Sequence, residues 1–282
     1  MAEINSSPTN TSFSVGFIGG GNMARSIIGG LTAGTKSSIK LQVYDQSTDT
    51  LTELANHFDI TPATSNQQIV EQCDVVVLAV KPQVMQSVLS ALDANQTQAV
   101  FLSIAAGLKI SSLAKWLDSE VAIIRAMPNT PALVQCGASG LYANQQVSVQ
   151  QKEYADIVMQ ATGIALWVDS EDLLDSVTAL SGSGPAYFFL VMEAMQAAAE
   201  KLGLNTETAK QLTLQTALGA ATLASQSSDS PATLRQRVTS PGGTTEQAIN
   251  TLVDNQLIEI FGKAMQAAYD RSKQLAVELD QK

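Results

Sequence analysis

The run GGGNMA at residues 19–24 directly follows the first apolar, β-like segment and opens a stretch compatible with a helix. It fits the pattern G-x-G-x-x-A, in which Gly19 permits a tight turn, Gly21 lets a pyrophosphate approach the backbone, and the small Ala24 lets the helix pack on the sheet. Free N–H groups at the start of that helix would face the phosphates. A purely structural turn is the alternative, but the position at the first strand–helix junction favours a dinucleotide-binding site.

Asp45 ends the second β-like segment, about two dozen residues after the glycines. An acid at this position typically accepts hydrogen bonds from the adenosine ribose hydroxyls and repels a 2′-phosphate. No arginine lies near Asp45 in the sequence to bind that phosphate, so the pattern favours NADH over NADPH. A carboxylate that only faces solvent in a turn is the alternative interpretation.

Two further segments lie at the expected carboxyl ends of strands, where ligands bind in open α/β sheets. The sequence AVKP (residues 79–82) closes the third strand-like run, and SIAAG (residues 103–107) closes the fourth. Lys81 could neutralise phosphate charge or could simply be solvated, and both interpretations stay open.

The run SPGGTT at residues 240–245 lies between two expected helices. Its structural interpretation is a Pro-Gly turn followed by a helix with Thr244 as N-cap and Gln247 as the capping-box partner. The same arrangement exposes several backbone N–H donors at the positive end of a helix dipole, which suits a small carboxylate. The hydroxyls of Ser240 and Thr245 could add direction, so the two interpretations are compatible.

Apolar, β-rich segments recur through the first half of the chain, and several, such as VVVLAV, lack alternation, as strands covered on both faces must. The expected strands are residues 13–19, 41–45, 74–80, 100–105, 121–126 and 139–142, with a later one at 165–168. Helix-compatible stretches are residues 23–31, 48–58, 67–72 and 85–92, with a later one at 148–162. This alternation predicts an α/β fold, a Rossmann-type doubly wound parallel sheet.

From residue 173 the pattern is helical, with expected helices at residues 173–180, 185–202, 206–225, 232–239, 245–254 and 257–279. The second of these is apolar nearly all round and must be buried on every side. Because a small helical domain has difficulty covering such a helix, we expect a homodimer whose helical halves share one core. The expected organisation is a disordered arm (1–12), a Rossmann dinucleotide-binding domain (13–169) and an all-α substrate-binding and dimerisation domain (170–282).

Composition narrows the classes of function. A formal charge of −10 argues against general nucleic-acid binding, which needs clustered Lys and Arg. His57 is the only histidine, and Cys73 and Cys136 have no CxxC spacing, so we expect no metal site and no catalytic histidine. The polar N-terminus does not resemble a signal peptide, and the longest apolar run is too short to span a bilayer, so we expect a cytoplasmic protein.

The motifs taken together resemble one family. FIGGGNMA, AVKPQ, SIAAG, RAMPNTPALV, SGSGPAY and SPGGTT occur in the order and spacing of the pyrroline-5-carboxylate reductases, which catalyse the last step of proline biosynthesis. The resemblance runs from Ser14 to the C-terminus, and RAMPNTP together with SPGGTT is very specific. It implies reduction of L-1-pyrroline-5-carboxylate to L-proline with NADPH or NADH. It also implies a Rossmann domain, a helical domain that interlocks with a second subunit, and dimers that assemble into larger rings.

The resemblance also implies roles for individual residues. Asp45 and Asn66 would lie near the adenosine ribose, and Thr245 would be catalytic. The pyrophosphate would be held by Ile18, Gly19, Gly20, Gly21, Asn22 and Met23. The nicotinamide side would be lined by Ala79, Val80, Lys81, Pro82, Ile104, Ala105 and Ala106. The substrate would be bound by Ser240, Gly242, Gly243, Thr244 and Thr245.

One departure from the family pattern concerns the cofactor. Many members carry a small hydroxyl residue, or a nearby Arg, where this chain has Asp45 and Gln46. The usual NADPH preference of the family is therefore not assured in this chain.

Two other functions stay open on the residues alone. One is a different NAD(P)H reductase, acting on another imine or on a β-hydroxy acid; the second substrate class normally requires a Lys after a Gly-rich turn, and after SGSGP no Lys occurs before Lys201. The other is a non-catalytic protein that senses nucleotides.

Overall fold

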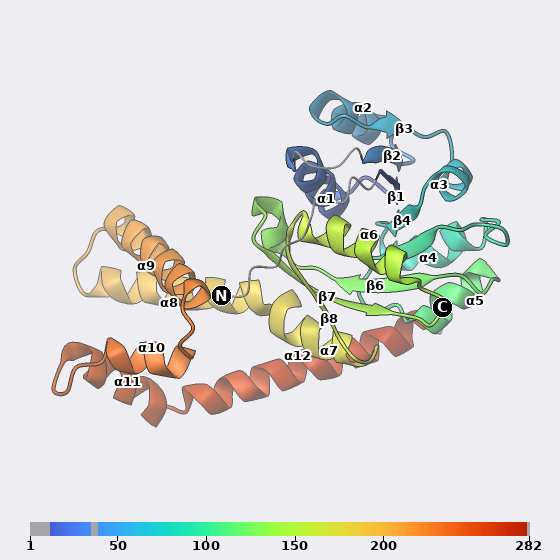
Figure 1. Cartoon of the computed structure of the whole chain (residues 1–282). Helices are drawn as coiled ribbons and strands as arrows, with labels where there is room; N and C mark the ends of the chain where they lie inside the picture. The colour runs from blue at the N-terminus through green and yellow to red at the C-terminus, as the bar shows by residue number, and fades with distance from the viewer. Residues whose placement is uncertain (1–11, 35–38, 281–282) are drawn as a thin grey trace. The chain divides into compact units, whose positions relative to one another are not determined.

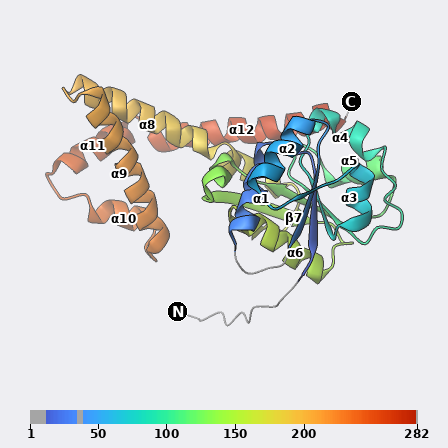
Figure 2. The same ribbon diagram turned by 90° about the horizontal axis from the view of Figure 1, so that it is seen from above.

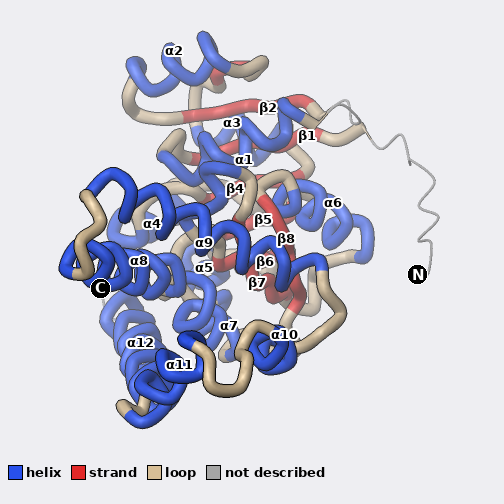
Figure 3. The backbone as a smooth tube through the Cα atoms, turned by 90° about the vertical axis from the view of Figure 1, so that its left-hand side faces the viewer, coloured by secondary structure: helices blue, strands red, loops and turns tan. Residues whose placement is uncertain are grey.

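The computed structural model describes residues 12–34 and 39–280, so the arm predicted at residues 1–12 lies outside the described residues except for Ser12. The chain forms two compact units. One unit runs up to Gly182 and resumes at Ala268, and the other is Ser183–Ala267. All described strands lie in the first unit, whereas the second contains helices and loops only (Figures 1 and 3).

An eight-stranded sheet forms the centre of the first unit, with the order β3-β2-β1-β4-β5-β6-β7-β8. Neighbouring strands are parallel except β6 and β7, which are antiparallel. The predicted strands are confirmed, while the short β3 and the reversed direction of the last two strands were not predicted. The strands are β1 (Ser14–Ile18), β2 (Lys40–Tyr44), β3 (Thr61–Pro62), β4 (Val75–Leu78), β5 (Val100–Ser103), β6 (Ile123–Met127), β7 (Gly137–Ala143) and β8 (Gly163–Trp167).

Helices cover both faces of this sheet, and Figure 2 shows α1 and α2 on one side with α3, α4 and α5 on the other. The first face includes buried side chains of α1, α2 and α6, and the second those of α3, α4 and α5. All four residues of β4 are fully buried, as a strand covered on both faces requires. The helices of this unit are α1 (Asn22–Ala33), α2 (Thr48–His57), α3 (Asn66–Gln72), α4 (Pro82–Leu89), α5 (Ile110–Leu117), α6 (Val149–Gln160) and α7 (Leu173–Val177).

The order of the strands creates a switch point between β1 and β4. From β1 the chain continues through α1 to β2 on one side, and it later returns through α3 to β4 on the other side of β1. In doubly wound sheets, the crevice outside the carboxyl ends of two such strands is where ligands bind. The segments that follow β1 and β4 are therefore the first place to look for a site.

The second unit contains α8 (Gly184–Lys201), α9 (Thr206–Gln226), α10 (Pro231–Arg237), α11 (Thr244–Asp254) and the first part of α12 (Leu257–Asp280). Helices α8 and α9 pack against each other. Large apolar side chains of α8 nevertheless stay exposed in the single chain, with Phe188 at 67%, Phe189 at 62% and Leu190 at 66%. Several large apolar side chains exposed together on one helix are typical of an interaction surface. Among the described residues, no helix combines the length and the apolar character that crossing a bilayer requires.

Close packing of α1 against the end of α6 gives a test of the fold. A Cβ atom added at Gly30 would lie 2.0 Å from the carbonyl oxygen of Ala161, so backbone would have to shift. We expect Gly30→Ala to cost about 1–3 kcal/mol, as overpacking does, and to lower Tm by roughly 2–10 °C in thermal unfolding.

Gly34→Ala, just beyond the end of the same helix, is the matched control. Gly34 has φ −78°, and an added Cβ would make only ordinary contacts at 3.6 Å or more. We expect its Tm to stay at the wild-type value or rise slightly, because alanine restricts the unfolded chain. Equal melting temperatures for the two variants would contradict the packing of α1 on α6.

Candidate functional site

The glycine loop after β1 is held tightly against the backbone of the neighbouring strands. Gly19 has φ +100°, and an added Cβ would lie 2.9 Å from the carbonyl oxygen of Ala79. The N–H of Gly19 donates to the carbonyl of Tyr44 (2.8 Å), and the N–H of Ala79 donates to Ile18 (2.9 Å). Gly21, the N-cap of α1, has nothing within 4 Å of an added Cβ. The loop is thus closed on the side of the sheet and open at Gly21, as the motif predicted.

Asp45 contacts this loop directly. Its Oδ2 accepts from the N–H of Gly20 at 2.8 Å, and its Oδ1 accepts from the N–H of Ser47 at 2.8 Å. Sequence reasoning placed Asp45 near the ribose but did not foresee these bonds, because they depend on how the turn after β2 closes. The carboxylate therefore fixes the Gly20 amide and also brings a negative charge to this end of the sheet.

A cavity of about 430 Å³ opens at the switch point between β1 and β4. It brings together seven predicted cofactor residues, namely Gly19, Gly21, Asp45, Asn66, Ala79, Val80 and Lys81. The lining residues that sequence reasoning missed are Tyr44, Gln46, Val84, Ser87 and Val88. Val84, Ser87 and Val88 lie on one face of α4, because residues three and four positions apart share a helix face. A helix predicted to start at Pro82 would have placed these residues together.

The donors and acceptors around this cavity fit a dinucleotide. The first-turn N–H groups of α1 have no intrahelical acceptor, and among the described residues no partner is found for those of Asn22 and Met23. Such amides at a helix N-terminus suit a pyrophosphate. Asn66 carries a buried Oδ1 atom with no hydrogen-bond partner in the described chain, and with Asp45 it offers acceptors for hydroxyl groups.

A larger cavity of about 620 Å³ lies at the amino ends of the central strands, where Asp74 and Ala99 precede β4 and β5. Its lining contains amide and carboxylate side chains but no Lys or Arg, and it includes none of the predicted site residues. It does not offer the chemistry that a pyrophosphate needs.

The residues predicted on the nicotinamide side follow two adjacent strands. Lys81 is the N-cap of α4 with an exposed side chain, and Pro82 is the first residue of that helix. Ile104 and the two alanines after it follow β5, outside the lining of the cavity, and the N–H of Ile104 donates to the carbonyl of Leu78 on β4 at 3.3 Å. Their assignment to the nicotinamide stays a prediction.

The SPGGTT segment of the second unit forms the predicted Pro-Gly turn. The N–H of Gly243 donates to the carbonyl of Ser240 at 3.0 Å, and Gly242 has φ +72°. A positive φ after proline is typical of a type II turn and favours glycine.

The predicted cap of α11 was wrong by one residue. Gly243, in an extended conformation, is the N-cap, and Thr244 is already helical. The side chain that bonds back to the preceding turn belongs to Glu246 rather than to Gln247: Oε2 of Glu246 accepts from the N–H of Gly242 at 2.8 Å. The shift arises because the turn ends at Gly243, and a capping pattern counted from that residue would have identified Glu246.

The start of α11 therefore offers donors for a small anion. Within the described chain, the N–H groups of Thr244 and Thr245 have no acceptor, and the hydroxyl of Thr245 forms no hydrogen bond. Thr245 is half-buried, whereas Ser240 and Thr244 are exposed. A carboxylate at this position would meet two backbone amides and a hydroxyl at the positive end of a helix dipole.

Groups capable of other chemistry lie elsewhere. No set of His, Cys, Asp and Glu side chains in the described part of the chain could hold a metal ion. Burial raises the pKa of the Cys73 thiol to about 12, so it stays protonated and unreactive. His57 lies in the last turn of α2, where its Nδ1 contacts the carbonyl of Glu53 at 2.8 Å.

Two family models match successive parts of this chain. The family model "Pyrroline-5-carboxylate reductase dimerisation" matches residues 171–275, and "NADP oxidoreductase coenzyme F420-dependent" matches residues 14–107. A pyrroline-5-carboxylate reductase of Pseudomonas aeruginosa is 51% identical over 95% of this chain and 98% of its own length.

Solved structures agree as well. A pyrroline-5-carboxylate reductase from Coxiella burnetii is 45% identical, covers 94% of this chain and 99% of its own, and has a TM-score of 0.89. A pyrroline carboxylate reductase from Plasmodium falciparum with NADP bound is 31% identical, covers 94% of this chain and 98% of its own, and has a TM-score of 0.80.

The match to a dimerisation domain indicates a homo-oligomer, in keeping with the exposed apolar side chains of α8. The nucleotide-binding loop, the cavity beside it and the near-complete coverage of these relatives lead to one conclusion. The chain belongs to the pyrroline-5-carboxylate reductases, the NAD(P)H-dependent oxidoreductases of proline biosynthesis.

Proposed function

We propose that this chain reduces L-1-pyrroline-5-carboxylate to L-proline. The observation that carries the proposal is the glycine loop at the switch point, beside a cavity whose amides and free acceptor fit a dinucleotide, in a chain that is 51% identical to a reductase of this name. The bound NAD(P)H supplies hydride from C4 of its nicotinamide.

The cofactor residues divide into three groups. Residues 18–23 form the pyrophosphate loop: the unpartnered amides of Asn22 and Met23 bond the phosphates, while the Gly19 and Gly20 amides are held by Tyr44 and Asp45 and fix the shape of the loop. Asp45 and Asn66 face the adenosine ribose, which the unpartnered Oδ1 of Asn66 supports. Residues 79–82 and 104–106 line the nicotinamide side, at the carboxyl ends of β4 and β5.

The substrate residues come from the turn before α11. The N–H groups of Thr244 and Thr245 clamp the substrate carboxylate, with Ser240 and Gly243 shaping the turn and Gly242 permitting its positive φ. The hydroxyl of Thr245 bonds the ring nitrogen. Because a cyclic imine can be protonated before hydride arrives, no strong general acid is required, and orientation contributes up to ~7–11 kcal/mol.

Assembly and location extend this proposal. We take residues 13–169 as the dinucleotide-binding domain and 170–282 as the substrate-binding and dimerisation domain, which the family model over residues 171–275 supports. The helical domains pair into dimers, which occur alone or assemble into rings of dimers. The exposed Phe188 and Phe189 side chains of α8 favour this pairing. The exposed free thiol of Cys136 favours a reducing compartment such as the cytoplasm.

A direct assay tests the activity. Purified protein is incubated with NADH or NADPH and glutamate semialdehyde, which cyclises to the imine, and the absorbance of the reduced cofactor is followed. We expect oxidation of the cofactor with formation of proline. Oxidation only with other imines or with β-hydroxy acids would indicate a different reductase, and binding without turnover would indicate a nucleotide sensor.

Asp45 provides a test of cofactor preference. Asp45→Asn removes the charge that repels a 2′-phosphate and keeps one acceptor oxygen, which can bond either the Gly20 or the Ser47 amide but not both, because the side-chain NH2 group only donates. We expect the ratio of kcat/KM for NADPH to kcat/KM for NADH to rise about tenfold, equivalent to ~1.4 kcal/mol. Asp45→Ala, which also frees the loop, should weaken the binding of both cofactors. An unchanged ratio in Asp45→Asn would show that the charge does not select the cofactor.

Thr245 provides a test of the substrate site. Thr245→Ala should lower kcat by more than about tenfold while changing stability by less than ~1 kcal/mol, because its hydroxyl forms no hydrogen bond within the described chain and it is not the N-cap. Thr251→Ala in the same helix, whose hydroxyl bonds the carbonyl of Gln247 at 2.9 Å, is the control and should keep wild-type turnover. A Thr245→Ala enzyme with normal kinetics would show that the assignment is wrong.

A further inference from the structure

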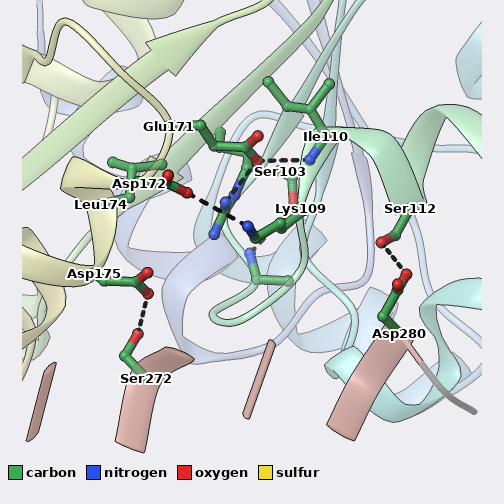
Figure 4. Close-up of polar contacts among 12 residues, drawn as sticks. Ser103, Lys109, Ile110, Ser112, Glu171, Asp172, Leu174, Asp175, Ser272 and Asp280 are labelled. Carbon is green, nitrogen blue, oxygen red and sulfur yellow. Dashed lines mark hydrogen bonds and ion pairs between the residues drawn. The ribbon is translucent and has the colours of Figure 1, made fainter. Parts of the chain in front are cut away.

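The loop of residues 104–109 connects β5 to α5 and is anchored at its far end by a residue distant in sequence. Oε1 of Glu171, in the segment before α7, accepts from the N–H of Ile110 at 2.7 Å. Ile110 is the first residue of α5, and the N-cap of this helix, Lys109, forms no side-chain cap. Glu171 therefore caps α5 from outside the helix, and its negative charge lies at the positive end of the helix dipole (Figure 4).

The same oxygen of Glu171 binds a buried guanidinium. Nη1 of Arg125 on β6 lies 2.7 Å from Oε1, and the side chains are only 11% and 22% exposed. A buried charge without a partner is strongly unfavourable, so Arg125 and Glu171 hold each other in place. Through this pair, the start of α5 is connected to the rigid central sheet.

The C-terminal end of α12 packs on the same loop. Gly107 has φ +77°, and an added Cβ would lie 3.1 Å from Cδ1 of Leu279. Ser112 on α5 donates to Asp280 at 2.5 Å, as Figure 4 shows. Leu108 is buried in the core cluster against which Leu279 packs. The loop is thus restrained on its inner side by packing and at its end by Glu171.

We propose that Glu171 is a positioning residue, which acts through the N–H of Ile110 and through Arg125 to hold residues 104–106 where hydride transfer requires them. The inference rests on the proposed function, which places these residues on the nicotinamide side. Glu171 does not line the cavity beside the glycine loop. Its loss should therefore affect the geometry of the nicotinamide end and leave the binding of the adenosine half intact.

Three single variants separate this role from general stability. Glu171→Ala removes the acceptor. Glu171→Gln retains it, because one oxygen accepts both bonds and an amide carbonyl oxygen can also accept two. Asp172→Ala is the matched control: this neighbouring carboxylate also reaches the loop, through Lys109 at 3.4 Å, but the pair is exposed and contributes little.

The first measurement is hydrogen exchange of residues 104–117 in the cofactor-free protein. We expect Glu171→Ala to exchange at least about tenfold faster than wild type in this segment, because its amides open more readily without the anchor. Glu171→Gln and Asp172→Ala should stay near the wild-type rate. Equal rates in Glu171→Ala and Asp172→Ala would overturn the proposal, whether or not the protein is a reductase.

The second measurement is steady-state kinetics with L-1-pyrroline-5-carboxylate. We expect Glu171→Ala to lower kcat by about 10- to 100-fold, as a misplacement of about 1 Å can, with KM for the cofactor within about threefold of wild type and with rescue by Glu171→Gln. A lower Tm with unchanged kcat would overturn the positioning role. Absence of turnover in the wild type would instead refute the proposed function and leave the exchange result to decide on the anchor.

Glu171→Ala leaves the buried Arg125 without its partner. If this variant folds poorly, the double variant Arg125→Met/Glu171→Ala takes its place. The double variant removes the buried charge together with the anchor. It should show the same fast exchange in residues 104–117, and wild-type exchange in this folded protein would overturn the proposal.

Discussion

The close approach of backbone to backbone at the carboxyl ends of β1 and β4 is the constraint on which the nucleotide site depends. The carbonyl of Ala79 leaves no room for a side chain at Gly19, and the positive φ of that residue turns the chain from the strand into α1. Asp45 then fixes the next peptide group through the Gly20 amide. The amides at the start of α1 are therefore presented beside the cavity by three strands at once, and the rest of the sheet supports that geometry.

Much of the first unit could be predicted from the sequence because its signals are local. Strands such as Val75–Leu78 are continuous apolar runs, and the glycine motif marks its own turn. The two-residue β3, which contains Pro62, has no periodicity to detect. Nothing in the pattern of Gly137–Ala143 indicates that β7 runs opposite to β6, since alternation does not encode direction.

The elements that were missed depend on distant partners. Helix α5 was not predicted, and its N-terminal amide is capped by Glu171, 61 positions away, so no local capping residue marks its start. The N-cap of α11 was misplaced by one residue because the register of the preceding turn decides it. The role of Asp45 in fixing the loop was also missed, since that contact needs the three-dimensional turn. The substrate residues rested on the SPGGTT motif and the family resemblance alone.

The uncovered aromatic face of α8 has a consequence for how such a chain becomes stable at all. Phe188, Phe189 and Leu190 remain in water until another molecule arrives, so part of the apolar burial that stabilises the fold is gained only on association. The free energy of unfolding then contains a mass-action contribution and increases with protein concentration. Refolding accordingly includes a bimolecular encounter, which becomes slower on dilution.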